Sequence, residues 1–379
     1  MSVQLQSVLI IGGGFSGLAA AIALAQEGRR ITLVEREPEW RMDGAGISIG
    51  GASLRALHAL GVLEGFLERG YAADGTDMRG PDGSPLARFP TPRLVNEDTP
   101  GNGAIMRPFL GEVLAEAALV AGTDVRFATT PTELREDTEH TLVTLSGPDG
   151  ERTETFDLVV AADGVFSQTR RTLFPEAPEP RFSGQGAWRA VLPRPAAIGN
   201  TTIWVGRPSK IGVNPIDAER LYLFVNEASD ERERIPEEQL IPRLDALLAP
   251  LPDPLVQELR ASIGPDALVL HRPMDQLLVP LPWHRGRVQL IGDAVHATTP
   301  HLAAGAGLGL EDALVLAEEL EAHSMLDDAL GAFEARRWER ARMVVENSAR
   351  LGELEAAPEG APAFGALQAE SMRLLAQPI

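Results

Sequence analysis

The chain has 379 residues, of which 44% are hydrophobic and 23% charged, a composition typical of a soluble globular enzyme with room for two domains. Its formal net charge of −20 argues against nucleic acid or an anionic membrane as a partner. The chain contains no cysteine, which excludes disulfides, zinc–thiolate sites and thiol chemistry. No apolar run is long enough to span a bilayer, and we expect a cytoplasmic protein.

The N-terminal segment predicts a strand, a tight turn, a helix and a second strand. Residues 8–11 form a short apolar run, and the Ala-rich segment 18–26 favours a helix. A glycine-rich turn at 12–17 joins them, and residues 31–34 form the next apolar run. This order is typical of a βαβ unit that binds a dinucleotide.

The glycines of this turn have separate physical roles. Gly12 allows a tight turn, Gly14 lets a pyrophosphate approach the backbone, and Gly17 lets the helix pack close to the strand. The helix N-terminus favours anions, and Glu35 is placed to accept hydrogen bonds from a ribose. A glycine turn without a nucleotide is the less favoured interpretation.

The remaining chain alternates between strand-like and helix-like patterns. Residues 36–51 are rich in glycine and predict a loop close to a ligand, and Gly-Pro-Asp-Gly at 80–83 predicts a hairpin turn. Further helices are expected at residues 53–60, 108–121, 236–248, 311–321 and 326–355. Further strands are expected at residues 125–128, 142–145, 157–162, 186–192, 201–205, 220–225 and 288–291.

These elements predict an α/β fold, in which a Rossmann-like dinucleotide-binding domain carries an inserted, mostly antiparallel β domain and C-terminal helices. The nucleotide domain is expected to be discontinuous, because a β-rich stretch separates its strands. We assign residues 1–71, 98–178 and 273–350 to the dinucleotide-binding domain, 72–97 and 179–272 to the substrate-binding β domain, and 351–379 to a C-terminal helix or tail.

Three motifs follow predicted strands. The first is Gly12-x-Gly14-x-x-Gly17, and the second is Asp163-Gly164-x-x-Ser167-x-x-Arg170. The third is Gly292-Asp293-Ala294-Val295-His296 with Pro300 and Gly305-Ala306-Gly307. Their order and spacing resemble the single-component flavoprotein aromatic hydroxylases, the p-hydroxybenzoate hydroxylase family, over nearly the whole chain. The segment after Asp293 looks most like the salicylate, 3-hydroxybenzoate, 6-hydroxynicotinate and urate hydroxylase branch.

The resemblance implies a bound FAD and a transient NADH or NADPH, because the chain has only one dinucleotide fingerprint. It also implies that O2 reacts with reduced FAD to give a C4a-hydroperoxide, which hydroxylates a small electron-rich aromatic or heteroaromatic substrate. Such proteins are expected to be monomers or homodimers. The alternatives are a monooxygenase for a larger, polyketide-like ring and a flavin-binding reductase or sensor without hydroxylase activity.

The resemblance and the chemistry of strand ends together give the expected FAD contacts. Asp293 can bind a ribityl hydroxyl, residues 305–309 can offer backbone N–H groups before a helix at Glu311, and Gly309 is expected to loosen that loop. Arg107 matches an FAD-contacting arginine, and Asp163 a position linked to FAD and the nicotinamide. The full set is Gly12, Gly14, Phe15, Ser16, Gly17, Glu35, Arg36, Gly46, Ile47, Arg107, Asp163, Asp293, Pro300, Gly305, Ala306, Gly307 and Leu308.

Three residues are candidates for catalysis. Lys210 is the only lysine, and it and Tyr222 are expected on paired strands, at what look like the positions of an arginine and a tyrosine in urate-type relatives. His301 follows Pro300 beside the expected flavin and could act as a base. The alternatives are a solvated Lys210, a core Tyr222 and a structural His301. A structural or FAD-side role is expected for His296, and a solvated face for the arginine cluster at 336–342.

Overall fold

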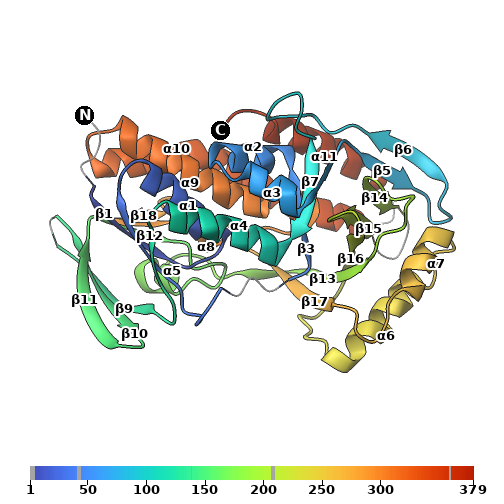
Figure 1. The fold of residues 1–379 in the computed structure, drawn as a ribbon, viewed down its shortest axis with the longest axis horizontal. Coiled ribbons are helices and arrows are strands. Elements are labelled where there is room, and N and C mark those ends of the chain that lie inside the picture. The colour runs from blue at the N-terminus through green and yellow to red at the C-terminus, as the bar shows by residue number, and fades with distance from the viewer. Residues whose placement is uncertain (1–4, 41–43, 138, 206–209, 358–359) are drawn as a thin grey trace.

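The computed structural model describes residues 5–40, 44–137, 139–205, 210–357 and 360–379 (Figure 1). Its central layer is a six-stranded sheet in the order β18-β19-β12-β1-β2-β8, parallel except for the edge strand β18. The core strands are buried, as expected for a parallel sheet covered on both faces. The strands are β1 (Ser7–Ile11), β2 (Arg30–Val34), β8 (Asp124–Arg126), β12 (Leu158–Ala161), β18 (His284–Arg285) and β19 (Val288–Leu290).

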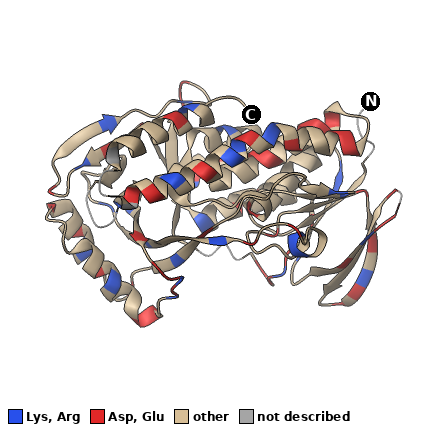
Figure 2. Ribbon diagram, turned by 180° about the vertical axis from the view of Figure 1, so that it is seen from behind, with Lys and Arg blue, Asp and Glu red and all other residues tan. Residues whose placement is uncertain are grey.

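Helices α1, α9 and α10 pack in a stack beside this sheet, with α4 against α1 (Figure 1). The long helix α10 carries acidic and basic residues along its length (Figure 2). None of the described helices is both long and apolar enough to cross a membrane. The helices of this region are α1 (Phe15–Gln26), α2 (Gly51–Ala59), α3 (Leu63–Arg69), α4 (Arg107–Val120), α5 (Gln168–Leu173), α8 (Asp293–His296), the 3-10 turn η1 (Pro300–Leu302), α9 (Gly305–Ala322) and α10 (Leu326–Ala356).

A second, seven-stranded sheet has the order β17-β13-β16-β15-β14-β5-β6 and is antiparallel except where β14 meets β5. Alternate side chains such as Trp188, Ile211 and Leu223 build an apolar cluster with α6 (Glu237–Leu248) and α7 (Pro254–Ala261). The opposite face is therefore free to line a site. The strands are β5 (Thr76–Arg79), β6 (Pro85–Phe89), β13 (Arg181–Pro193), β14 (Thr201–Trp204), β15 (Lys210–Pro215), β16 (Arg220–Ala228) and β17 (Val269–Gln276).

Two small sheets and a final helix complete the fold. One sheet joins β9 (Thr130–Glu136), β10 (Thr141–Gly147) and β11 (Gly150–Phe156); the other joins β3 (Gly46–Gly50), β4 (Tyr71–Ala73) and β7 (Asn102–Met106). The loop predicted over 36–51 is thus wrong for residues 46–51, which form β3 and the first residue of α2. Helices α3, α5, α7 and α8 were not predicted. Helix α11 (Ala361–Leu375) lies in the segment expected to form a C-terminal helix or tail, and it is stabilised by packing on α10 and η1.

Candidate active site

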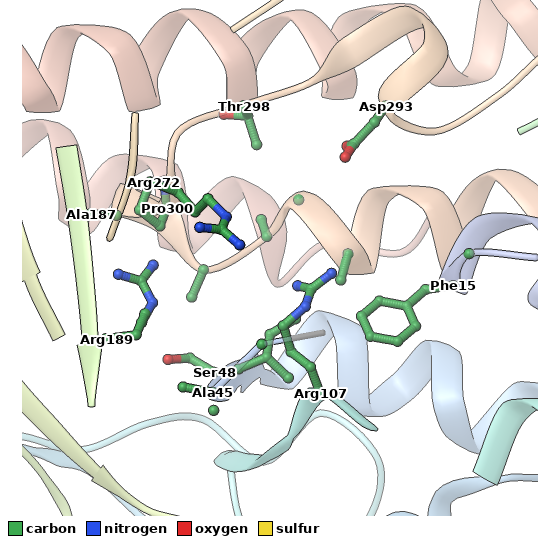
Figure 3. A pocket seen from close by; sticks show the side chains of 18 of the residues that line it. Phe15, Ala45, Ser48, Arg107, Ala187, Arg189, Arg272, Asp293, Thr298 and Pro300 are labelled. Atoms are coloured by element: carbon green, nitrogen blue, oxygen red, sulfur yellow. The ribbon is translucent and has the colours of Figure 1, made fainter. Parts of the chain in front are cut away.

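A cavity of about 560 Å³ lies between the carboxyl edge of the six-stranded sheet and the free face of the seven-stranded sheet (Figure 3). Strands β19, β12 and β1 are neighbours, so the three glycine-containing motifs that follow them meet at one edge. Gly14, Gly164 and Asp293, one from each motif, all line the cavity. The sheet order therefore explains why motifs far apart in sequence serve one site.

The first motif gives its glycines distinct environments. Gly12 has φ +103° and a Cβ there would lie 2.6 Å from the carbonyl oxygen of Ala162, while a Cβ at Gly17 would overlap the carbonyl oxygen of Gly12. At Gly14 a Cβ would meet nothing within 4 Å, because it would point into the cavity. No side chain caps α1, so its N–H groups are free to bind an anion at this point.

Asp293 and Arg107 face each other across the cavity (Figure 3). Burial lowers the pKa of Arg107, and Asp293 opposes that shift; burial raises the pKa of Asp293, and His296 and Arg107 oppose it. The Arg107 guanidinium also lies 4.8 Å from the centre of the Phe15 ring. The site thus offers a carboxylate for ligand hydroxyls and a cation stacked on an aromatic ring.

The N-terminus of α9 closes the cavity. This helix begins at Gly305 rather than at Glu311. Residues 305–309, which were predicted to form a loop, are therefore the first residues of the helix. A Cβ at Gly309 would overlap Ser16 of α1, and one at Gly307 would overlap Ser53. Gly309 therefore permits close helix packing, and the expectation that it loosens a loop is wrong.

A second cavity, of about 510 Å³, adjoins the first on the same face of the seven-stranded sheet. The three candidate catalytic residues Lys210, Tyr222 and His301 all line it. The residues that line both cavities, and so mark their junction, are Ser48, Arg189, Tyr222, Pro300, Ala303 and Ala304. The two cavities are therefore continuous at this junction, and a ligand in one can reach a ligand in the other.

Residues 6–348 match the family described as FAD binding domain. The chain belongs to this family. A 2-heptyl-3-hydroxy-4(1H)-quinolone synthase of Pseudomonas aeruginosa is 32% identical over 359 residues, 92% of this chain and 90% of that protein. A FAD-dependent urate hydroxylase of Mycolicibacterium vanbaalenii is 30% identical over 346 residues, 89% of this chain and 86% of that protein. Klebsiella pneumoniae HpxO, solved with FAD and uric acid, has a TM-score of 0.82 at 25% identity and covers 98% of this chain and 95% of its own.

These findings confirm the predicted fold, the resemblance to flavoprotein hydroxylases and the FAD cofactor. The protein is an oxidoreductase of the FAD-dependent monooxygenase type. The first cavity fits FAD, because it combines the open approach at Gly14, the free N-terminus of α1 and the Asp293 carboxylate. These are the features that a pyrophosphate and a ribityl chain require.

The expected FAD contacts divide into two groups. Those that line the cavity are Gly14, Phe15, Ser16, Gly46, Ile47, Arg107, Asp293, Pro300, Gly305 and Ala306. Those that do not line it are Gly12, Gly17, Glu35, Arg36, Asp163, Gly307 and Leu308. Of these, Asp163 accepts hydrogen bonds from Ser167 and Thr169 and so caps α5.

Glu35 and Arg36 lie beside the first motif. Glu35 accepts hydrogen bonds from the amides of Gly13, at 2.7 Å, and Glu37, at 3.0 Å, and so ties the end of β2 to the glycine turn. The Arg36 side chain is 78% exposed and lies 3.6 Å from Glu37. Whether Glu35 also binds a ribose stays a prediction.

A buried ionic network supports the third motif from behind. Asp312 of α9 accepts hydrogen bonds from the Gly292 amide at 2.9 Å and from Arg337 Nε at 2.8 Å, and its Oδ2 lies 2.6 Å from His296 Nε2. Burial alone would raise the pKa of Asp312, but His296 and Arg337 hold it well below its usual range. His296 therefore contacts the network rather than the cavity.

The solvated face expected for the arginine cluster is wrong for two of its members. Arg337 is 1% exposed, and Arg340 makes a bidentate pair with Glu311. The Arg342 side chain is 40% exposed, in line with the expected solvated face, and it pairs with Glu339 and Glu346. Arg337 and Arg340 therefore point from α10 toward α9, and the sequence spacing of the arginines did not indicate this.

The strand register places two of the candidate residues in separate parts of the second cavity. Lys210 lies opposite Asn226, and Tyr222 lies opposite Asn214, so both face the cavity from adjacent strands as predicted. Four residues along a strand correspond to about 13 Å, so Lys210 lies at the far end and Tyr222 at the junction. The Lys210 ammonium lies 5.1 Å from the centre of the Phe364 ring.

Tyr222 is held by a chain of polar side chains. Its hydroxyl shares a hydrogen bond with Ser48, whose oxygen also accepts one from Asn214 at 3.2 Å. A Cβ at Gly46 would overlap the Tyr222 ring, so this glycine makes room for the tyrosine. Burial raises the pKa of Tyr222, with Arg189 opposing, and the phenol stays protonated at neutral pH.

His301 is enclosed between η1 and the end of α10. Its Nδ1 lies 2.9 Å from Thr299 Oγ1, and its Nε2 lies 3.0 Å from Glu355 Oε2. Burial lowers the pKa of His301, Glu355 opposes this shift, and Lys210 adds to it. The imidazole is therefore neutral at neutral pH.

Sequence reasoning missed Arg189 and Glu355. A charged residue between Trp188 and Ala190 in a strand is a signal that could have identified Arg189, because one face of that strand is apolar. No sequence pattern marked Glu355 as a site residue, because its contact with His301 depends on how the end of α10 packs against η1.

Proposed function

We propose that this FAD-dependent monooxygenase hydroxylates a small electron-rich aromatic or heteroaromatic compound, with NADH or NADPH as reductant and O2 as oxygen source. The observation that carries this proposal is the junction of the two cavities at Tyr222, Arg189 and Pro300. The relatives support it, since one is named a urate hydroxylase and another a synthase of a hydroxylated quinolone.

FAD, when bound, supplies the transfer of electrons and the activation of oxygen. The chain's own residues bind and orient the aromatic ring and exclude water from it. Tyr222 holds its phenol proton and can donate a hydrogen bond to the substrate if its link to Ser48 rotates away. Helix α11 covers the second cavity through Gln368, Met372 and Leu375, which limits access of water.

The nicotinamide cofactor is proposed to bind only transiently. Among the described residues one glycine turn follows a parallel strand in the manner of a dinucleotide site, and we assign that turn to FAD. We also propose the domain division given above, which is supported by the presence of β5, β6 and β13–β17 in one sheet. A cytoplasmic monomer or homodimer is proposed, and the absence of cysteine is compatible with a reducing compartment.

A second candidate is hydroxylation of a larger ring system. Its support is the size of the second cavity, about 510 Å³, which suits a drug-sized ligand better than one benzene ring. Apolar side chains line much of it, among them Leu94, Ile203, Leu302 and Met372.

A substrate panel tests both candidates. The panel comprises 3-hydroxybenzoate, uric acid, 4(1H)-quinolone and a 2-alkyl-4(1H)-quinolone, each added to the holoprotein with NADH or NADPH. We expect at least one compound to stimulate oxidation of the reduced nicotinamide and to yield a hydroxylated product; stimulation by the alkylquinolone alone would favour the larger ring. A flavin-binding reductase or sensor would show no hydroxylated product with any compound.

Replacement of the single lysine should weaken substrate binding. No ion pair within 4.0 Å joins the Lys210 ammonium to a carboxylate of the described residues, although its charge lowers the pKa of Glu355. The ammonium can therefore pair with an acidic group of the substrate. A charged hydrogen bond of about 1.5–3 kcal/mol corresponds to about one to two powers of ten. Lys210→Met should therefore lower kcat/KM by about that factor, retain FAD, and divert more reduced nicotinamide to hydrogen peroxide; unchanged kcat/KM would place Lys210 outside the site.

His301 should influence the pH dependence below neutrality. Because burial lowers its pKa, the imidazole becomes neutral as pH rises through a value below the usual ~6.5. If the neutral form is required, kcat/KM should rise through that value in the parent protein and lose the inflection in His301→Ala. His323→Ala, in a partly exposed histidine at the end of α9, is the control and should keep the parent profile. An inflection that persists in His301→Ala would assign the titration to another group.

A further inference from the structure

A threonine hydroxyl and an imidazole meet in the segment between α8 and α9. Thr299 lines the first cavity and His301 lines the second, so the contact between them runs from one cavity to the other. Thr299 Oγ1 lies 2.9 Å from His301 Nδ1, and the two residues are only 2% and 5% exposed. Figure 3 shows Thr298 and Pro300, the chain neighbours of Thr299, on the wall of the first cavity.

A carboxylate lies on the other side of this imidazole. Glu355, in the last turn of α10, places its Oε2 3.0 Å from His301 Nε2. The charged side chains that act on His301 are Glu355 and Lys210 of β15. Burial alone would raise the pKa of Glu355, but Lys210 and His301 hold it below its usual range. At neutral pH Glu355 is therefore an anion beside a neutral imidazole.

These charges determine which nitrogen of His301 carries the single proton of the neutral ring. An ionised carboxylate only accepts hydrogen bonds, so the proton belongs on Nε2, which faces Glu355. The other nitrogen, Nδ1, then presents a lone pair and accepts the hydroxyl proton of Thr299. The lone pairs of Thr299 Oγ1 are left for a ligand in the first cavity that donates a hydrogen bond.

The other histidine of this segment lacks such an arrangement. His296 pairs with Asp312, but it lines neither cavity, and its Nδ1 has no hydrogen-bond partner among the described residues. His301 instead joins a hydroxyl on a cavity wall to a buried carboxylate. In this order a hydroxyl can pass a proton to an imidazole while the carboxylate offsets the charge that results.

We propose that Thr299, His301 and Glu355 form a proton relay that accepts the proton of an acidic O–H or N–H group of the aromatic substrate. This inference rests on the proposed function and adds the route of its proton. Thr299 lies next to Pro300, which lines both cavities, so a ring at the junction can bring such a group to the hydroxyl.

The proton transfer has two coupled parts. The O–H or N–H bond of the substrate breaks, and its electron pair stays on the ring system. Thr299 Oγ1 takes this proton as it gives its own to His301 Nδ1, and Glu355 stabilises the imidazolium. Thr299 contacts the substrate, whereas Glu355 is a positioning residue that acts through His301. The N–H group of a reduced flavin is a second donor that can reach Thr299, and the test distinguishes the two sources.

The test follows the ionisation of 4-nitrophenol, whose anion is coloured, in complex with the oxidised holoprotein. The complex is mixed rapidly from acidic into neutral buffer, and the absorbance of the 4-nitrophenolate gives the rate of proton loss. Thr299→Val keeps the shape of the side chain and removes the hydroxyl, so it should lower this rate about a hundredfold. Thr299→Ser should keep the parent rate. The final amount of bound anion and the FAD content should be unchanged in both.

Glu355→Gln tests the positioning role. Because the carboxylate opposes the effect of burial on His301, its removal should lower the pKa of this histidine further. NMR of protein labelled in its seven histidines should show this shift, and the rate of proton loss should fall about tenfold. Thr202→Val is the matched control, because Thr202 is a buried threonine of β14 that bonds the Asn200 carbonyl and lines neither cavity. It should keep the parent rate.

A parent rate in Thr299→Val overturns the proposal. So does a parent protein that does not bind 4-nitrophenol or does not ionise it. If Thr299 instead serves the reduced flavin, Thr299→Val will shift the pKa of that flavin and leave the rate of the probe unchanged, which also overturns it.

If Thr299→Val fails to fold with FAD, Glu355→Gln decides, because an unchanged His301 titration and an unchanged rate there contradict the relay. These readouts need no turnover. A failure of the hydroxylase function therefore appears in the substrate panel and stays distinguishable from a failure of this inference.

Discussion

Gly14→Val should abolish FAD binding and leave a folded protein. The backbone at Gly14 has φ −74° and ψ 178°, a conformation that valine adopts readily, and no described atom lies within 4 Å of the position of a Cβ. The valine methyl groups would occupy the space through which the pyrophosphate approaches the turn. The purified variant should be colourless, with the circular dichroism and gel-filtration behaviour of the parent protein after FAD removal.

Gly331→Val provides the control, because Gly331 lies on α10 with open space around it and far from the glycine turn in the chain. It should retain stoichiometric FAD. Gly12→Val, in contrast, should fail to fold, because Gly12 has φ +103° and a Cβ would press on Ala162. A yellow Gly14→Val protein with full FAD content would contradict the assignment of this turn to the pyrophosphate.

Arg337→Met should produce the largest loss of stability. Its guanidinium lies 2.8 Å from Asp312 and 3.0 Å from Glu311, and it is almost completely buried. Its removal leaves Asp312 with His296 and the Gly292 amide, and Glu311 with Arg340, as their remaining partners. Loss of one partner from a buried ion pair typically costs about 3–5 kcal/mol. The free energy of unfolding from urea titration should fall by about that amount, with FAD present at equal saturation in both proteins.

Two comparisons make this result specific to the network. Arg342→Met removes an exposed arginine of the same helix and should change stability much less. Asp312→Asn combined with Arg337→Met should cost less than the sum of the two single changes, because the second change then removes an already unpaired group. Equal losses in Arg337→Met and Arg342→Met would show that the buried pair is not the cause.

The sequence identified the elements whose patterns are local. The glycine turn, the parallel strands of the six-stranded sheet and the hairpin at 80–83 were predicted correctly, because a turn glycine or a short apolar run has few other interpretations. Helix α9 was predicted to start late because glycines are poor helix formers. Its first turns are stabilised instead by contact with Ser16 and Ser53, which only the folded chain brings together.

The cavity-lining residues that belong to a sequence motif were predicted. Those whose position depends on tertiary packing were missed. Gly14, Arg107 and Asp293 line the first cavity as expected, because each belongs to or accompanies a motif at the sheet edge. Arg189 and Glu355 belong to no motif, and their positions depend on how β13 and the end of α10 meet the cavities. The segment of helix α11 was expected only as a helix or tail, because its Pro- and Ala-rich sequence is stabilised by the surface on which it packs.

The source of the oxygen atom tests the central claim most directly. The holoprotein is incubated with reduced nicotinamide and the active compound of the panel under 18O2, and the product is examined by mass spectrometry. A monooxygenase predicts that each product molecule gains one 18O atom from O2, and that none is gained when the label is in water. An unlabelled product, or recovery of all consumed oxygen as hydrogen peroxide with every compound, would contradict the account.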